Sequence, residues 1–379
     1  MQIVPLTYTR AAGWSAPIPA ALDSPHTLVL AFGASDLFDH HEPFRALADA
    51  FPASIVTGCS TSGTVLGAKV VDHLLAVAVV RFDRVALRAV LLPVTVTSAS
   101  HDVGSSLGQQ LQAPDLRGVL VLSDGVIVNG SDLAAGLNAV LPSSVVVTGG
   151  LAGDDDRFMR TWILHNGRPE VERVTALGFY GDHVQFQAGS KGGWDIFGRE
   201  RTVTKSDGNI LLELDGQPAL DLYKKYLGDF ASGLPATGLL FPLAILRDMD
   251  DQDPIVRTLL GIDEEARSLR FAGNVPQGAM VRLMHTNLDR LIDGATDAAE
   301  QARGPHGEDA PVLSVAISCA GRRWVLGDRT DEELENVLAE LPSNTTQLGF
   351  YSYGELSPRR QGPCDLHNQT MTLTTISER

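Results

Sequence analysis

The stretch GLNAVLPSSVVVTGGLAG (residues 136–153) runs from the end of an amphipathic helix through Pro142 into a valine-rich segment that stops at two glycines. A proline just past a helix, followed by an apolar run, is typical of a helix that ends and a strand that begins. The same pattern recurs in ALADAFPASIVTGCSTSG (46–63) and VLAELPSNTTQLGFYSYG (337–354). The spacing from proline to glycine is six residues in one copy and seven in the others: Pro52 to Gly58, Pro142 to Gly149 and Pro342 to Gly349.

An apolar run also precedes each of these three helices, in TLVLAFG (27–33), GVLVLSDG (118–125) and VLSVAIS (312–318). Each copy is therefore expected to form a strand, a helix and a second strand, and such a crossover joins parallel strands. Asn166-Gly167, or the nearby GRPE (167–170), indicates an antiparallel hairpin as well. The sequence predicts an α/β fold of two α/β regions with mixed sheets and internally similar strand-helix-strand units. We place the division between residues 1–215 and 216–379.

Charge and apolar content exclude several classes of protein. The net charge of −16 opposes sequence-independent binding to nucleic acid or to an anionic membrane surface. No apolar run reaches the roughly 20 residues of a membrane-spanning helix, and MQIVPLTYTRAAGW at the start does not resemble a signal peptide. Three widely spaced cysteines fit a reducing compartment better than a disulfide framework, so we expect a cytoplasmic protein without membrane insertion.

The glycine-rich ends of the repeated units are the candidate ligand site. Ligands of open α/β sheets bind beyond the carboxyl ends of the strands, and glycine lets the backbone approach them closely. Carboxylates there suit an amine, and an arginine suits a carboxylate. The alternatives are hydroxyls that cap helices and acids that are only solvated. The predicted ligand-binding residues are Cys59, Ser60, Thr61, Ser62, Gly63, Gly149, Gly150, Gly153, Asp154, Asp155, Arg322, Tyr353, Gly354, Glu355 and Asn368.

Other site chemistries lack their motifs. No lysine follows the glycines as a phosphate-binding loop requires, and Asp154 to Asp156 do not follow the calcium-loop register. Cys319, Cys364 and His367 lack the paired spacing of a structural zinc site. The chain has no GxSxG nucleophile frame and no GxGxxG fingerprint. We therefore predict no metal site and no catalytic residue.

Two longer blocks show a resemblance to a known family. They are GSKGGWDIFGRERTVTKSDGNILLELDGQPALDLYKKYLG (189–228) and the segment from CAGRRWVLG (319–327) through GFYSYGELSP (349–358) to CDLHNQTMTLTTISE (364–378). Together with the glycine loops, they resemble the N and C domains of the FIST sensory family over nearly the whole chain. The matching site positions are Gly149, Gly150, Gly153, Asp154, Cys319, Arg322, Gly354, Glu355, His367 and Asn368.

The resemblance implies a signal-input protein that binds a small polar, amino-acid-like ligand between its two halves. Because the chain contains no output domain, it would signal in trans to a partner such as a histidine kinase. Some relatives are haem proteins that sense nitric oxide, and His367 is the candidate iron ligand in that alternative. An unrecognised small-molecule enzyme and a pure interaction scaffold are the remaining alternatives.

Overall fold

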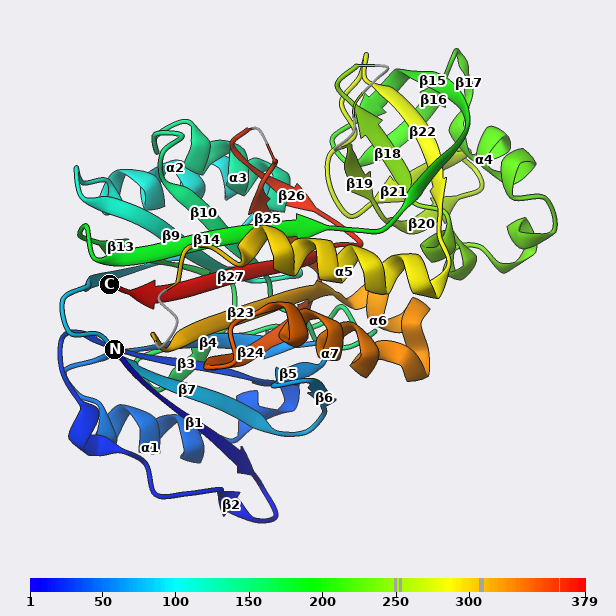
Figure 1. Ribbon diagram of the computed structural model, residues 1–379. Coiled ribbons are helices and arrows are strands. Elements are labelled where there is room, and N and C mark those ends of the chain that lie inside the picture. The colour runs from blue at the N-terminus through cyan, green and yellow to red at the C-terminus, as the bar shows by residue number, and fades with distance from the viewer. Residues whose placement is uncertain (249–250, 252–253, 307–309, 361) are drawn as a thin grey trace.

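The computed structural model describes residues 1–248, 251, 254–306, 310–360 and 362–379. These residues form four β-sheets (Figure 1). Three sheets pack together with helices on their outer faces, and the fourth lies at the upper right of Figure 1. This fourth sheet is formed by residues 195–285, which we call the insert, and we call the rest of the chain the body.

The body sheets gather strands from distant parts of the chain. The first contains β1 (Gln2–Thr9), β2 (Gly13–Trp14), β3 (Thr27–Ala34), β4 (Ile55–Thr61), β7 (Leu75–Arg81), β11 (Ile163–His165) and β12 (Arg168–Glu170). The second contains β8 (Ala86–Pro93), β9 (Leu116–Ser123), β10 (Val146–Leu151), β13 (Arg173–Tyr180), β25 (Gly354–Pro358) and β26 (Cys364–His367). The third contains β5 (Thr64–Leu66), β6 (Lys69–Val71), β14 (Val184–Lys191), β23 (Val312–Cys319), β24 (Thr345–Ser352) and β27 (Met371–Glu378).

Six strands have the same arrangement in all three sheets, and the first sheet has β2 as a seventh strand at one edge. The orders are β12-β11-β4-β3-β7-β1-β2, β26-β25-β10-β9-β13-β8 and β6-β5-β24-β23-β27-β14. The pairs β3 and β4, β9 and β10, and β23 and β24 are parallel. The connections are α1 (Glu42–Ala50), α3 (Gly130–Asn138), and α6 (Ala320–Leu326) with α7 (Thr330–Glu340). The predicted α/β class, the mixed sheets and the three similar units are therefore confirmed.

Each unit sends a hairpin into the sheet of a neighbouring unit. After β4, the hairpin β5-β6 pairs with β24 of the third sheet. After β10, the hairpin β11-β12 pairs with β4 of the first sheet, and after β24, β25-β26 pairs with β10 of the second. The chain then returns to its own sheet through β7, β13 or β27. The three units are thus joined in a closed cycle.

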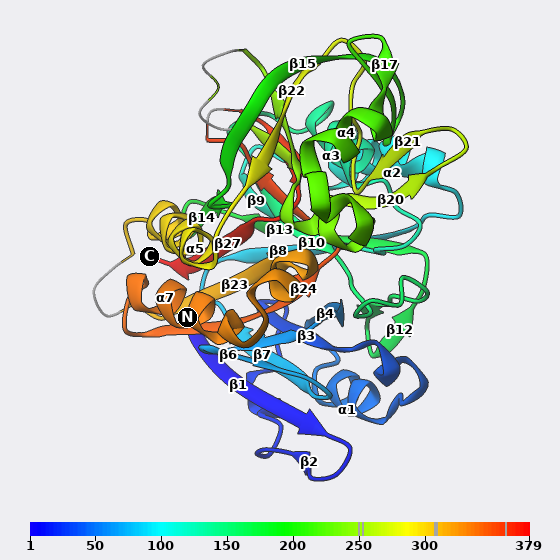
Figure 2. The ribbon, with the colours of Figure 1, turned by 90° about the vertical axis from the view of Figure 1, so that its right-hand side faces the viewer.

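One apolar core lies where the three sheets meet. Phe32 of β3, Leu122 of β9, Ile317 of β23 and Phe350 of β24 are fully buried in the same cluster. The rings of Phe32 and Phe350 lie 4.9 Å apart between centroids. The outer faces are covered by α1, by α2 (Ser100–Leu111) with α3, and by α5 (Leu288–Ala302) with α7 (Figures 1 and 2).

The first glycine of each repeated stretch lets two parallel strands approach. A Cβ atom on Gly58, Gly149 or Gly349 would lie 1.7, 1.9 or 1.7 Å from a carbonyl oxygen of the paired strand. No side chain fits at such a distance, so these three positions require glycine. The repeated glycine is therefore a packing feature of the crossover unit.

The insert leaves the body through one strand and returns through its neighbour. Its strands are β15 (Asp195–Asp207), β16 (Ile210–Leu214), β17 (Gln217–Pro218), β18 (Leu243–Leu246), β19 (Ile255–Arg257), β20 (Leu259–Asp263), β21 (Ser268–Phe271) and β22 (Met280–His285), with the helix α4 (Ala219–Leu227). β15 pairs with β22, and the insert has its own apolar core. The division at residues 215 and 216 stays a prediction; in the structure both lie in the turn between β16 and β17.

Candidate functional site

The three predicted glycine-rich loops meet at one end of the body. The Ser62 N–H donates to the Tyr351 carbonyl at 2.9 Å, and the Gly153 N–H donates to the Ser60 carbonyl at 3.1 Å. The Tyr353 N–H donates to the Leu151 carbonyl at 3.1 Å. The ends of β4, β10 and β24 are thus linked to one another by main-chain hydrogen bonds. The structure brings together stretches that lie far apart in the sequence.

At this junction, Asp154 is used to hold its own loop. Its side chain is buried, and one carboxylate oxygen accepts a hydrogen bond from the Tyr353 hydroxyl. The other accepts from the N–H groups of Met159 and Arg160 at 3.0 and 2.9 Å. A buried carboxylate that already accepts three hydrogen bonds is poorly placed to bind an incoming amine. The ligand-binding role predicted for Asp154 therefore has no support in its geometry.

Most other predicted junction residues also have structural contacts. Cys59 is buried in the central core, where burial raises the pKa of its thiol. Ser60 accepts from the Trp162 N–H at 3.0 Å, and Ser62 accepts from the Asp155 N–H at 3.0 Å. The remaining glycines lie against neighbouring side chains: Gly150 against Ile317, Gly153 against Ser62 and Gly354 against Leu366.

Thr61, Gly63 and Asp155 line a cavity of about 670 Å³ beside the junction, which we call the loop cavity. Arg323 also lines it, donating to the Ser62 carbonyl at 2.6 Å and pairing with Asp72 at 2.7 Å. Asp155 pairs with Arg157 at 3.3 Å, and burial raises the pKa of its carboxyl. The arginine and the aspartates named here thus already have partners of opposite charge.

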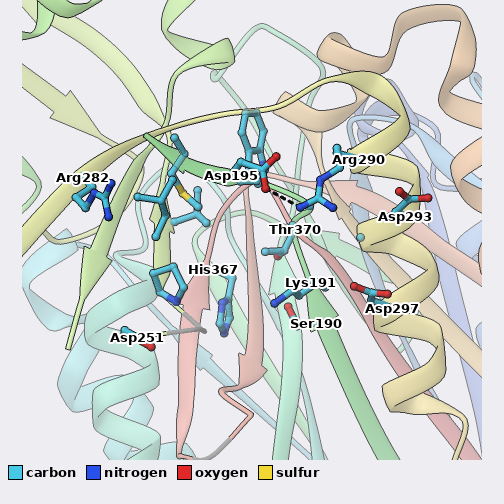
Figure 3. A pocket seen from close by; sticks show the side chains of 18 residues that line it. Ser190, Lys191, Asp195, Asp251, Arg282, Arg290, Asp293, Asp297, His367 and Thr370 are labelled. Carbon is cyan, nitrogen blue, oxygen red and sulfur yellow. Dashed lines mark hydrogen bonds and ion pairs between the residues drawn. The ribbon is translucent and has the colours of Figure 1, made fainter. Parts of the chain in front are cut away.

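Four of the predicted residues of the C-terminal half lie at or behind a different cavity: Arg322, Glu355, His367 and Asn368. It has a volume of about 350 Å³ and is lined by the end of β14, by β15 and β22 of the insert, by α5, and by the segment between β26 and β27 (Figure 3). We call it the interface cavity because it lies between the body and the insert. Its lining includes His367 and Thr370.

Arg322 lies behind this cavity and is completely buried. Its guanidinium donates to Glu333 at 2.7 and 2.5 Å. It also donates to the main-chain carbonyl of Gly192, which lines the cavity, at 2.5 Å, and to those of Leu291 at 2.7 Å and Gln369 at 3.3 Å, each next in sequence to a lining residue. An arginine has five N–H donors, and all five are used. Arg322 therefore has no donor left for a ligand carboxylate, and it positions the cavity walls instead.

Glu355 and Asn368 also act behind the cavity. Glu355 is buried and accepts from the hydroxyls of Ser352 at 2.6 Å and Thr370 at 3.0 Å, while burial raises its pKa to about 8. Asn368 is buried and accepts from the N–H of Thr258 in the insert at 3.4 Å. Both residues fix the segment that carries His367 and Thr370. They support the site without facing a ligand.

His367, the candidate haem ligand, points toward the cavity in Figure 3. Its Nε2 lies 3.1 Å from the Ser357 carbonyl, and this hydrogen bond must break before Nε2 could bind iron. No cluster of three or more histidines, cysteines or acids suited to a metal ion occurs in the described part of the chain. Haem binding stays a prediction, which a visible absorption spectrum of protein produced with added iron tests.

Sequence reasoning missed the charged groups that line the interface cavity. Lys191 has no hydrogen-bond or ion-pair partner among the described residues, and Arg282 donates only to the Gly198 carbonyl. Asp293 and Asp297 lie one turn apart on α5, and within the described residues neither has a hydrogen bond or a cation within 4 Å (Figure 3). Lys191 stands in the quoted sequence SKGGWD, but a single lysine in a sequence does not indicate a binding site.

The cavity also has an apolar patch, which lies beside Arg282 of the insert. It is formed by Ile196, Val256 and Met284 of the insert together with Trp194, whose indole N–H donates to the Gln369 carbonyl at 2.9 Å. Arg290 also lines the cavity, but it pairs with Asp195 at 2.6 Å. The cavity therefore combines Lys191 and Arg282, which form no ion pair among the described residues, with two exposed aspartates near Arg290 and a patch suited to an apolar group.

Family models match most of this chain. The FIST N domain matches residues 27–217, and the FIST C domain matches residues 219–358. The chain therefore belongs to the FIST family, whose domains are sensory, small-ligand-binding domains of signal transduction rather than enzymes. No helix among the described residues is long and apolar enough to cross a membrane.

Two individual proteins are also similar. An uncharacterized protein of Methanocaldococcus jannaschii, MJ1623, is 24% identical over 229 residues. This match covers 56% of the chain but only 41% of that relative, so the chain spans less than half of its length. The crystal structure of a cyanuric acid hydrolase from A. caulinodans matches 78% of this chain and all of its own, at 11% identity. Its TM-score of 0.18 is too low to support an argument.

Proposed function

We propose that this protein is a sensory module that binds a small zwitterionic, amino-acid-like ligand in the interface cavity and signals in trans. The observation that carries the proposal is that cations and carboxylates which form no ion pair within 4 Å among the described residues line this one cavity. Lys191 would bind the anionic group of the ligand, and Asp293 or Asp297 the cationic group. The apolar patch would contact the ligand's side chain.

The position of the cavity supports a sensory role. The body supplies Lys191 and the two aspartates, whereas the insert supplies Val256, Arg282 and Met284. A ligand that contacts both parts stabilises one arrangement of the insert relative to the body. Because a ligand shifts an equilibrium only by its difference in affinity for two states, such bridging contacts are what a sensor needs.

The insert and the body meet through a buried apolar cluster as well as through hydrogen bonds. In the cluster, Leu246, Val256 and Met284 of the insert pack with Leu291, Ile292 and Leu326 of the body. Arg257 of the insert is buried and donates to the Leu366 carbonyl at 2.8 Å, while Asn274 donates to Asp132 at 2.9 Å. A partner such as a histidine kinase of a two-component system would read the arrangement of the insert relative to the body. The buried, unpaired cysteines fit a cytoplasmic location.

Calorimetric titration of the purified protein with the common amino acids and related zwitterions tests this proposal. For a ligand that binds, Lys191→Met and Asp297→Asn should each weaken affinity about 10- to 100-fold, the range for a charge-assisted hydrogen bond. Lys225→Met, on exposed α4, and Glu300→Gln, on the same helix as Asp297, are matched controls. If no zwitterion binds, or if all four variants behave alike, the proposal is wrong.

A further inference from the structure

A third hollow lies on another side of the insert, and more apolar side chains line it than line the loop cavity or the interface cavity. It has a volume of about 550 Å³ and lies between β20 and β21 of the insert and the body segments that follow β9 and β10. We call it the apolar cleft. Its lining also includes the polar side chains of Thr97, Asn129 and Asn209.

Exposed apolar side chains are concentrated here. Val126, Phe158 and Leu260 line the cleft and are 46%, 42% and 38% exposed. Val96 and Met159, also exposed, directly adjoin lining residues in the sequence. Contiguous exposed apolar surface in a concave site is unusual for a protein surface and marks a place of binding.

The body wall of the cleft is held in place by its own contacts, so its apolar surface exists before anything binds. The ring of Phe158 stacks on that of Tyr353, with centroids 4.2 Å apart and planes 14° from parallel. The turn with Val126 and Ile127 is fixed because the Asp124 carboxylate accepts from both N–H groups at 2.9 Å. A preformed site avoids the entropy cost of ordering its walls during binding.

One cation completes the cleft. Arg270 is exposed and has no hydrogen-bond or ion-pair partner among the described residues, and none of the described lining residues is acidic. The nearby carboxylates are already engaged, since Asp124 accepts from its own turn and Asp132 accepts from Asn274. In a chain of net charge −16, an apolar hollow with a single uncompensated guanidinium selects an anion with an apolar body.

We propose that the apolar cleft is a second binding site, which takes a small amphiphilic carboxylate. The carboxylate pairs with the Arg270 guanidinium, and the hydrocarbon chain lies along Val126, Leu260 and the stacked ring of Phe158. This site is separate from the interface cavity, because the two share no lining residue. The inference therefore does not depend on the proposed function.

Decanoate below its micelle concentration is the probe, measured by calorimetry and by displacement of the fluorescent apolar anion 1-anilinonaphthalene-8-sulfonate. We expect Arg270→Gln and Leu260→Ser each to weaken decanoate binding at least fivefold. Decanol lacks the carboxylate, so its affinity for the wild-type protein should be no higher than the affinity of decanoate for Arg270→Gln. Affinity should rise from hexanoate to decanoate, by at most about fourfold for each methylene group. Arg81→Gln, which changes an exposed arginine without a partner among the described residues, should have no effect.

Several outcomes would overturn the inference. They are absence of decanoate binding, equal binding by Arg270→Gln and wild type, or equal binding of decanol and decanoate. Binding that needs Leu260 but not Arg270 would show a non-specific apolar surface instead of the proposed site. Lys191→Met should leave decanoate binding unchanged, which separates this test from that of the proposed function.

Discussion

Replacing Arg322 with methionine removes the cation that joins three walls of the interface cavity. The change leaves Glu333 buried without its cation, although Glu333 still accepts from the Tyr351 hydroxyl at 2.9 Å. It also removes the donors to the carbonyls of Gly192, Leu291 and Gln369. Breaking one side of a buried ion pair costs about 3–5 kcal/mol, so we expect a loss of at least about 3 kcal/mol in the free energy of unfolding.

Urea unfolding followed by circular dichroism measures this loss, and Arg323 supplies the matched control. Arg323 is the next residue and also makes an ion pair, but its side chain is 23% exposed and its partner Asp72 is 46% exposed. Such a pair contributes about 0–1 kcal/mol, so Arg323→Met should unfold nearly as wild type does. Arg322→Lys keeps the charge but only three donors, and it should lie between the two methionine variants.

A double variant separates the ion pair from the carbonyl contacts. Arg322→Met combined with Glu333→Gln leaves no unpaired buried charge, so part of the lost free energy of unfolding should be recovered. The part that comes from the hydrogen bonds of Arg322 to the three main-chain carbonyls should stay lost. If Arg322→Met matches Arg323→Met within 1 kcal/mol, the structural role assigned to Arg322 is refuted. Weak ligand binding with normal stability would instead restore its predicted role as a ligand-binding residue.

Three further predictions follow from the packing and the buried groups. Gly349→Ala should reduce the free energy of unfolding by more than 3 kcal/mol in urea titrations, because its Cβ would lie 1.7 Å from the Ala316 carbonyl oxygen. Gly278→Ala is the control: its Cβ would meet no atom within 4 Å, and its φ of +85° should lower the free energy of unfolding by only about 1–2 kcal/mol. Burial raises the pKa of Glu355 from 4.5 to about 8, so the folded state keeps a proton that the unfolded chain releases. This contribution to the free energy of unfolding is full below pH 4.5 and falls as the pH rises toward 8, by up to about 1.4 kcal/mol per pH unit. In Glu355→Gln, the free energy of unfolding should depend less on pH between 4.5 and 8. A pH dependence equal to that of the wild type would contradict the assignment. Three cysteines are buried: Cys59, Cys319 and Cys364. A thiol reagent should modify none of them in the folded protein and all of them in urea. Rapid labelling of the native state would show that the core opens.

Local sequence pattern was sufficient for the crossover units but not for their assembly. The prolines, apolar runs and glycines around β4, β10 and β24 act over fewer than 20 residues, so they could be interpreted without tertiary information. The hairpin at Asn166-Gly167 was likewise predictable, and both residues adopt positive φ. The exchange of hairpins between sheets was not predictable, because β5, β11 and β12 are only three residues long and pair with distant strands.

The site was harder to predict because neighbouring residues have opposite environments. Arg322 is fully buried and Arg323 is half-buried, yet α6 spans only seven residues, which is too short for a periodic pattern to show which face is inside. Asp154 and Asp155 differ in the same way at the junction. Lys191, Asp293 and Asp297 come together only because the chain between them folds as a separate unit and returns beside its starting point.

The cyclic exchange of hairpins has a consequence for how the molecule can be divided. In each sheet, the hairpin at one edge comes from another repeated unit. A unit by itself would therefore leave the strand next to that hairpin unpaired on one side. A fragment cut at a unit boundary would expose unpaired strand edges, which are sites of aggregation. The three repeated units therefore need one another to fold, even though each resembles an independent strand-helix-strand unit in the sequence.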